Sequence, residues 1–194
     1  MKGGGGKFKL PKELQNKQCL LNIESPTDMC FKYAIVAALH HNEIISRGCH
    51  KNNALYYVPF IKQYNFDGIC FPASAEDVVK FQKLNMTVAI NALLYVAPKN
   101  DKPFSIVPIY HPPHSLVKSR SIAKILLVND HWFSIVNLNF LLRDKESHSY
   151  YCYHCLRNLH HSERLKQHMH KCYNSMRQKV NMPSEEKKFK KFDN

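Results

Sequence analysis

Three cysteines and one histidine in the last quarter of the chain have a spacing that suits metal binding. They form the pattern Cys152-x2-Cys155-x12-His168-x3-Cys172. A Cys-x2-Cys pair fits a tight knuckle, and ligands four residues apart lie one turn apart on the same side of a helix. Three thiolates and one imidazole make a closed tetrahedral set for structural zinc. We therefore expect one zinc ion in a small module of two strands and a helix over residues 150–173.

The apolar residues around these ligands occur where a small zinc module keeps its core. Tyr150 lies two residues before the first cysteine, Leu159 four residues after the second, and Leu165 three residues before the histidine. In these positions the segment resembles a two-Cys two-His zinc finger whose final histidine is a cysteine, as in Cys-Cys-His-Cys variants. Two alternatives stay open: the four residues are unliganded surface groups, or another histidine replaces His168. The other histidines that could do so are His160, His161 and His170.

The same segment is basic. Residues 150–173 hold four basic side chains and one acidic side chain, and those four could contact the phosphates of DNA or RNA. Base-specific readout has no support, because fingers that read bases act in tandem, each covering about three base pairs, and this sequence has one. A single finger equally suits protein docking or stabilisation of a domain. The basic residues are Arg157, Arg164, Lys166 and Lys171.

A second pair of residues could act as a nucleophile and its base. The segment 25–28 predicts a helix start capped by Thr27 or Asp28, which puts Cys30 in the first turn of a helix that reaches about His41. The helix dipole and the free N–H groups at that end favour a thiolate. His131, at the start of a predicted strand, could supply the imidazole that such a nucleophile needs. The alternative is that Cys30 is a buried helix residue and His131 a turn residue.

The order of helix cysteine and strand histidine is that of papain-like folds, and the local sequences resemble the ovarian-tumour (OTU) family of deubiquitinating cysteine proteases. The segment 27–35 is similar to that family's cysteine motif, and the segment 131–132 is similar to its histidine–aromatic pair, although the motif's glycine is missing. The resemblance implies that Cys30 is the nucleophile, that His131 is its base, and that N–H groups around 28–30 form the oxyanion site. Asp28 and Asn137 are the candidates for the orienting residue. A ubiquitin-like protein or a polyprotein would then be the substrate.

The pattern over about residues 19–173 also resembles the region that precedes the polymerase in Maverick/Polinton-type transposon and virus-like B-family DNA polymerases. Segments 30–40, 64–72 and 131–138, followed by the zinc module, carry this resemblance. It implies a mobile-element or viral origin and work near DNA. The sequence has no Asp-x-Asp metal site for nucleotidyl transfer, so no polymerase activity is expected. The predicted function is that of a zinc-binding accessory protein of such a replication system, and an OTU-like cysteine isopeptidase or protease is the alternative.

The elements that must position these residues lie between 19 and 142, a segment long enough for a core and holding the only Trp. Its pattern predicts helices first and strands later, with Asn129-Asp130 favouring a tight hairpin. We therefore predict an α+β fold, a papain/OTU-like domain with a late antiparallel sheet, followed by the zinc module. The predicted helices are 30–41 and 74–84, and the predicted strands are 86–92, 106–110, 122–128 and 131–138.

Charge is concentrated outside this segment. Of the formal net charge of +13, residues 1–18 carry +4, residues 19–142 carry +3 and residues 143–194 carry +6. Composition predicts a flexible basic tail at 1–18, a linker at 143–149 and a basic polar tail at 174–194. This distribution favours DNA or RNA contacts through the finger and tails over a basic groove in the core.

The composition excludes some classes of protein. Apolar runs such as 34–39 and 122–128 are far shorter than the roughly 20 residues of a membrane helix, so no membrane partner is expected. The basic first residues lead into no apolar segment, which predicts an intracellular, nuclear or cytoplasmic protein that is not secreted. The histidines at 40–41 and at 111 and 114 are expected to be ordinary core or surface residues, because no second ligand pair has suitable spacing. The cysteines expected to be structural are Cys19, Cys49 and Cys70.

Overall fold

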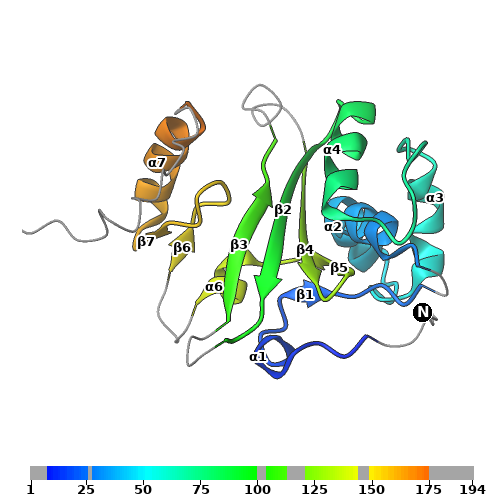
Figure 1. The fold of residues 1–194 in the computed structure, drawn as a ribbon, viewed down its shortest axis with the longest axis horizontal. Coiled ribbons are helices and arrows are strands. Elements are labelled where there is room, and N and C mark those ends of the chain that lie inside the picture. Colours follow the sequence, from blue (N-terminus) through cyan, green and yellow to red (C-terminus); the bar gives the residue numbers. More distant parts are fainter. Residues whose placement is uncertain (1–7, 26–27, 100–103, 113–120, 144–148, 175–194) are drawn as a thin grey trace, which may run out of the picture.

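A five-stranded sheet forms the centre of the computed structural model, which describes residues 8–25, 28–99, 104–112, 121–143 and 149–174 (Figure 1). The strand order is β1-β5-β4-β2-β3. The strands are β1 (Leu20–Leu21), β2 (Ala89–Val96), β3 (Ser105–Tyr110), β4 (Ile122–Val128) and β5 (His131–Ile135). The helices before residue 150 are α1 (Lys12–Gln15), α2 (Cys30–Ser46), η1 (Ala54–Tyr56), α3 (Val58–Ile61), α4 (Ala75–Leu84) and α6 (Leu138–Leu142).

The α+β class is confirmed, but the sheet is mixed rather than antiparallel. β2 pairs antiparallel with β3 and parallel with β4, while β4–β5 and β5–β1 are antiparallel. From β2 to β5 successive strands reverse direction, and β4 lies beside β2 instead of beside β3. The two strands that run the same way therefore become neighbours, which a prediction from local hairpin signals does not capture.

The hairpin of β4 and β5, whose second strand begins at His131, forms where Asn129-Asp130 predicted a tight turn. β4 has the predicted bounds, and Asn129 and Asp130 both have positive φ angles, 46° and 62°. A two-residue turn of this kind needs left-handed backbone at both positions, which Asn and Asp tolerate better than other non-glycine residues. β5 is three residues shorter than predicted, because the Asn137 side chain accepts a hydrogen bond from the Phe140 backbone N–H and begins α6.

The two faces of the sheet have separate cores. The face covered by α2 and α4 buries Phe31, Phe81, Ile125 and Trp132 among others, and we call it the first core. The opposite face buries Leu14, Leu93, Leu126, Phe133, Ile135, Leu138 and Leu141, which we call the second core. In Figure 1 the helices α2, α3 and α4 lie on one side of the sheet, and the C-terminal module with α7 (Ser162–Asn174) lies on the other.

The two long helices begin where the sequence places them. α4 is capped by Ser74, whose capping box with Asp77 satisfies N–H groups of the first turn. α2 begins at Cys30, but its cap is Met29 without a side-chain hydrogen bond, so Asp28 is not the cap. α2 also runs five residues past the predicted end at His41, because Ile44 continues its buried face.

β2 begins three residues later than predicted. The buried Gln82 side chain donates to the Val88 carbonyl at 2.8 Å and accepts from the Ile90 N–H at 3.0 Å, which ties the turn after α4 to the strand. The strand that follows pairs with β4 from Ala89 to Leu94 and with β3 from Ala92 to Val96. The bounds of β2 are therefore set by its pairing with neighbouring strands, which the local sequence pattern does not reveal.

The first described residues correct the prediction of a flexible tail over 1–18. Residues 12–15 form α1, and Leu14 is 1% exposed in the second core. The Lys17 ammonium donates to the carbonyl oxygens of Leu141 and Arg143, both at 2.8 Å, at the end of α6. Buried Leu14 and these two hydrogen bonds offset the chain entropy that the glycine- and lysine-rich composition suggested would dominate. Residues 1–7 and most of the predicted linker and C-terminal tail, 144–148 and 175–194, lie outside the described residues.

Candidate metal centre

The C-terminal module is built from two short strands and one helix. β6 (Tyr150–Tyr151) pairs antiparallel with β7 (Asn158–Leu159), and α7 follows. The turn between the strands is held by hydrogen bonds from the Leu156 N–H to the Cys152 carbonyl, 2.8 Å, and from the Cys152 N–H to the Arg157 carbonyl, 3.1 Å. Leu156 itself has a φ of 58°. The segment thus adopts the predicted knuckle.

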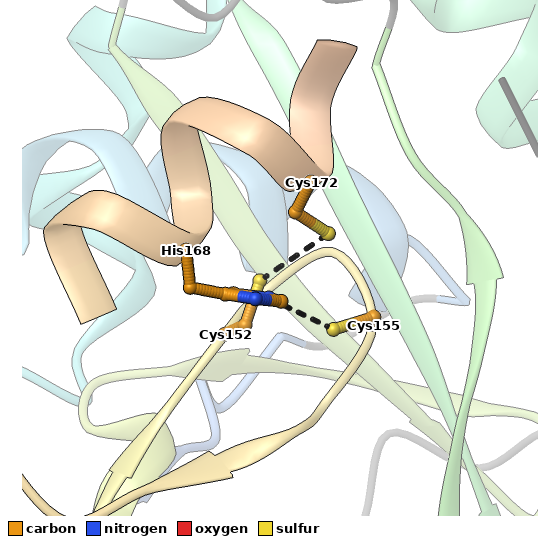
Figure 2. Close-up of side chains that lie close together, drawn as sticks. All are labelled: Cys152, Cys155, His168 and Cys172. Carbon is orange, nitrogen blue, oxygen red and sulfur yellow. Dashed lines mark hydrogen bonds between the residues drawn. The ribbon is translucent and has the colours of Figure 1, made fainter. Parts of the chain in front are cut away.

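The four predicted ligands converge in this module. Their ligand atoms all lie within 4.8 Å of one another (Figure 2). Cys155 Sγ is 3.2 Å from His168 Nε2, and Cys152 Sγ is 4.0 Å from Cys172 Sγ. A tetrahedral site with metal–sulfur bonds of about 2.3 Å has sulfur atoms about 3.8 Å apart. The group is therefore positioned to hold one metal ion.

Helix α7 supplies two of the ligands because of its period. His168 and Cys172 are four residues apart, so both side chains leave the same side of the helix, and Figure 2 shows them pointing toward the knuckle. The knuckle supplies the other two ligands. The His154 backbone N–H points to Cys152 Sγ at 3.4 Å, a contact that stabilises a sulfur carrying negative charge.

Burial decides the protonation of the metal-free thiols. It raises the pKa of Cys152, which is completely buried. Burial, followed by the neighbouring Cys152 and Cys155 sulfurs, raises the pKa of Cys172 to about 12. Thiols in this state are protonated at neutral pH, so a bound cation must displace protons, and metal binding strengthens as pH rises.

The choice among histidines is resolved in favour of His168. His160, His161 and His170 are exposed and stand outside the ligand group. The four residues are the one such Cys/His/Asp/Glu group in the part of the chain that the structure describes. Four protein ligands leave no open position for a substrate, which is the arrangement of a structural site.

The structure does not bring Cys30 and His131 together as a nucleophile and its base. Cys30 lies in the first core and is 7% exposed. Burial raises the pKa of its thiol, against the opposing effect of the nearby Trp132 backbone N–H, so the sulfur is protonated. Trp132 packs on Phe31 on this face of the sheet, and the preceding side chain, His131, leaves the opposite face.

His131 is occupied on that opposite face. Its Nε2 is 3.0 Å from Asn22 Oδ1, and its ring stacks on Phe8 and lies against Phe133, both with centroids 4.8 Å away. Burial lowers the pKa of the imidazole. Asn22 is thus the partner of His131, and no motif in the sequence pointed to it, because the two residues meet only through the pairing of β1 with β5.

Neither candidate for the orienting residue has that role. Asn137 caps α6, and Asp28 is exposed beside the start of α2, where its charge contributes to the raised pKa of Cys30. The four predicted catalytic residues therefore do not form one site. A prediction from their order in the chain was wrong about the geometry, because both faces of β5 are buried and the pattern does not reveal where His131 points.

The remaining cysteines and histidines lie apart from the metal centre, with one exception. Cys19 is buried and Cys49 partly buried, as structural residues would be, whereas Cys70 is exposed. His40 bonds the Tyr64 hydroxyl at 2.7 Å, and His41 bonds the Ala37 carbonyl at 3.2 Å. The exception is His111, whose ring stands 4.6 Å from that of His154 in the knuckle. His114 lies outside the described residues.

Two further observations bear on the class of protein. Among the described helices, none is long and apolar enough to cross a membrane. Comparison of the chain with protein-family models, with curated proteins and with solved structures gave no match.

Proposed function

We propose that the chain is a zinc-binding accessory protein that holds nucleic acid through the outer surface of its zinc module. The observation that carries this proposal is the convergence of Cys152, Cys155, His168 and Cys172 on one point. Three soft sulfur donors and one imidazole in a closed set suit zinc, whereas hard cations such as Mg²⁺ prefer oxygen. The bound zinc fixes α7 against β6 and β7 and so fixes the side chains that α7 presents.

Four cations on the surface of the module, three of them on α7, support a phosphate-binding role. Arg157, Arg164, Lys166 and Lys171 are all exposed, and the one acidic residue of the module, Glu163, pairs with Lys166 at 2.8 Å. Three of the four cations therefore have no carboxylate partner among the described residues. Cations of this kind bind the nucleic-acid backbone by releasing counterions, without reading its sequence.

We further propose that the chain works in a mobile-element or virus-like replication system. This rests on its resemblance to the region that precedes the polymerase in Maverick/Polinton-type elements. In such a system a module of this kind would keep the chain on DNA or RNA. The further basic residues at both ends of the sequence would add to this contact.

The test is the salt dependence of binding to a fluorescent oligonucleotide. Replacing Arg164 and Lys171 with Glu should weaken binding at least about tenfold near 100 mM salt and make the salt slope shallower by about two phosphates. The matched control is Lys51→Glu with Lys62→Glu, which reverses two exposed lysines on the far side of the sheet. Equal binding by both double variants, or wild-type binding that salt leaves unchanged, would overturn the proposal.

A further inference from the structure

We propose that the metal centre also acts as a clamp on the sheet, so that metal binding and the folding of the second core are thermodynamically linked. The connection is the knuckle, defined here as residues 151–156, which carries two of the ligands and packs on the sheet. The clamp affects the stability of the chain and does not depend on nucleic acid.

Apolar contacts join the knuckle to the second core. Tyr151, Tyr153 and Leu156 pack against that core from the module side. The core beneath them includes Leu126 and Phe133, which are completely buried. The knuckle therefore covers part of the sheet that would otherwise face water, and this burial favours the docked state.

Polar contacts fix the orientation of the docked knuckle. The Tyr151 backbone N–H donates to Asn139 Oδ1 at 3.0 Å, and the Tyr151 hydroxyl donates to the Leu142 carbonyl at 3.3 Å. On the sheet, the Lys124 ammonium lies 4.2 Å from the centroid of the Tyr153 ring. Contacts with α6 and with β4 thus hold the knuckle from two elements of the main domain.

The metal ligands alternate with the docking residues. Cys152 lies between Tyr151 and Tyr153, and Cys155 precedes Leu156, so an ion bound to these sulfurs restrains the backbone that docks. Without the ion, β6 and β7 are two residues each and have no core large enough to order them alone. Loss of metal therefore raises the entropy cost of docking and loosens the cover over the second core.

Linkage makes this coupling reciprocal. If metal favours docking by some factor, docking must favour metal binding by the same factor. A substitution in the main domain that removes a docking contact should therefore weaken metal binding, even though it changes no ligand.

The first experiment measures metal affinity by competition with a chromophoric chelator for zinc. Asn139→Ala removes the hydrogen bond to Tyr151 and should weaken zinc binding several-fold. The matched control is Asn53→Ala, which also removes an Asn side chain that accepts a backbone N–H at 3.0 Å, but at η1 on the other side of the sheet. Equal zinc affinity in the two variants would overturn the proposal.

A second experiment uses the unaltered chain and needs no variant to fold. Hydrogen exchange is compared between the zinc-loaded protein and the same protein stripped by a chelator. Amides of β3, β4 and α6 should exchange several-fold faster in the stripped protein, in addition to those of the module. Faster exchange confined to residues 150–174 would show an independent module and contradict the linkage. Neither experiment measures nucleic-acid binding. A negative result in either one therefore argues against the linkage and not against the proposed function, and a chain that does not bind nucleic acid can still show the linkage.

Discussion

Individual cysteines in this chain differ in what their surroundings allow. Cys152, Cys155 and Cys172 meet at a point with an imidazole, whereas Cys30 stands alone in an apolar core. Desolvation raises the pKa of a buried thiol, and only a thiolate is a good nucleophile. Position at the start of a helix is therefore not enough to make Cys30 reactive.

Alkylation of the folded, zinc-loaded protein tests the assignment of Cys30. We expect Cys70, which is exposed, to react with iodoacetamide first and Cys30 to react slower by at least about tenfold, because its thiol is buried and protonated. Mass spectrometry of the digested protein at successive times gives both rates. Labelling of Cys30 as fast as Cys70, or a Cys30-dependent adduct with a thiol-reactive ubiquitin probe, would restore the hypothesis of a cysteine protease.

The histidines of the main domain predict a loss of stability in acid. Burial lowers the pKa values of His40, His41 and His131 below the ordinary value of 6.5, so the folded chain resists protons that the unfolded chain takes up. Stability should then fall as pH drops from about 7 to about 5, through the pKa of the unfolded histidines. Urea unfolding at several pH values, with metal held saturating, measures this slope.

A substitution at His131 isolates its part of that slope. His131→Gln keeps a polar group beside Asn22 but cannot take up a proton, so its stability should depend less on pH than that of the wild type. His50→Gln, at an exposed position, is the control and should leave the slope unchanged. Identical slopes in all three proteins would contradict the burial of His131.

The helix and strand boundaries that the sequence predicted well are those determined by nearby residues. The Asn129-Asp130 turn set the bounds of β4 and the start of β5, and the Ser74 cap set the start of α4. The four candidate ligands converge as the sequence predicted, because each spacing reports one local structure, a knuckle or a helical turn. Signals of this kind need no knowledge of the rest of the chain.

The elements predicted poorly depend on distant partners. β2 is placed by its pairing with β3 and β4, and α1 by the burial of Leu14 in a core made of residues far along the chain. The face of β5 that carries His131 could not be predicted, since Trp132 and Phe133 are both buried and alternation gives no sign of direction. The proposed catalytic pair failed for this reason, although its order along the chain was that of papain-like folds.

At the scale of the whole molecule, the chain is a sheet covered on both faces. Helices α2 and α4 cover the first core, while α1, α6 and the knuckle cover the second core. The C-terminal module is therefore part of the cover. The four basic side chains of the module are exposed. The surface of the module that does not pack on the sheet is open to a partner. The concentration of positive charge outside residues 19–142 favours a polyanion as that partner.

X-ray absorption at the zinc edge reports the ligands of the metal centre. Protein purified without added metal and dialysed against a metal-free buffer should retain one zinc per chain. Its spectrum should fit three sulfur neighbours at about 2.3 Å and one nitrogen at about 2.0–2.1 Å. Protein that retains no metal, or zinc surrounded by oxygen or by two or more nitrogens, would contradict the assignment of Cys152, Cys155, His168 and Cys172 as the ligands.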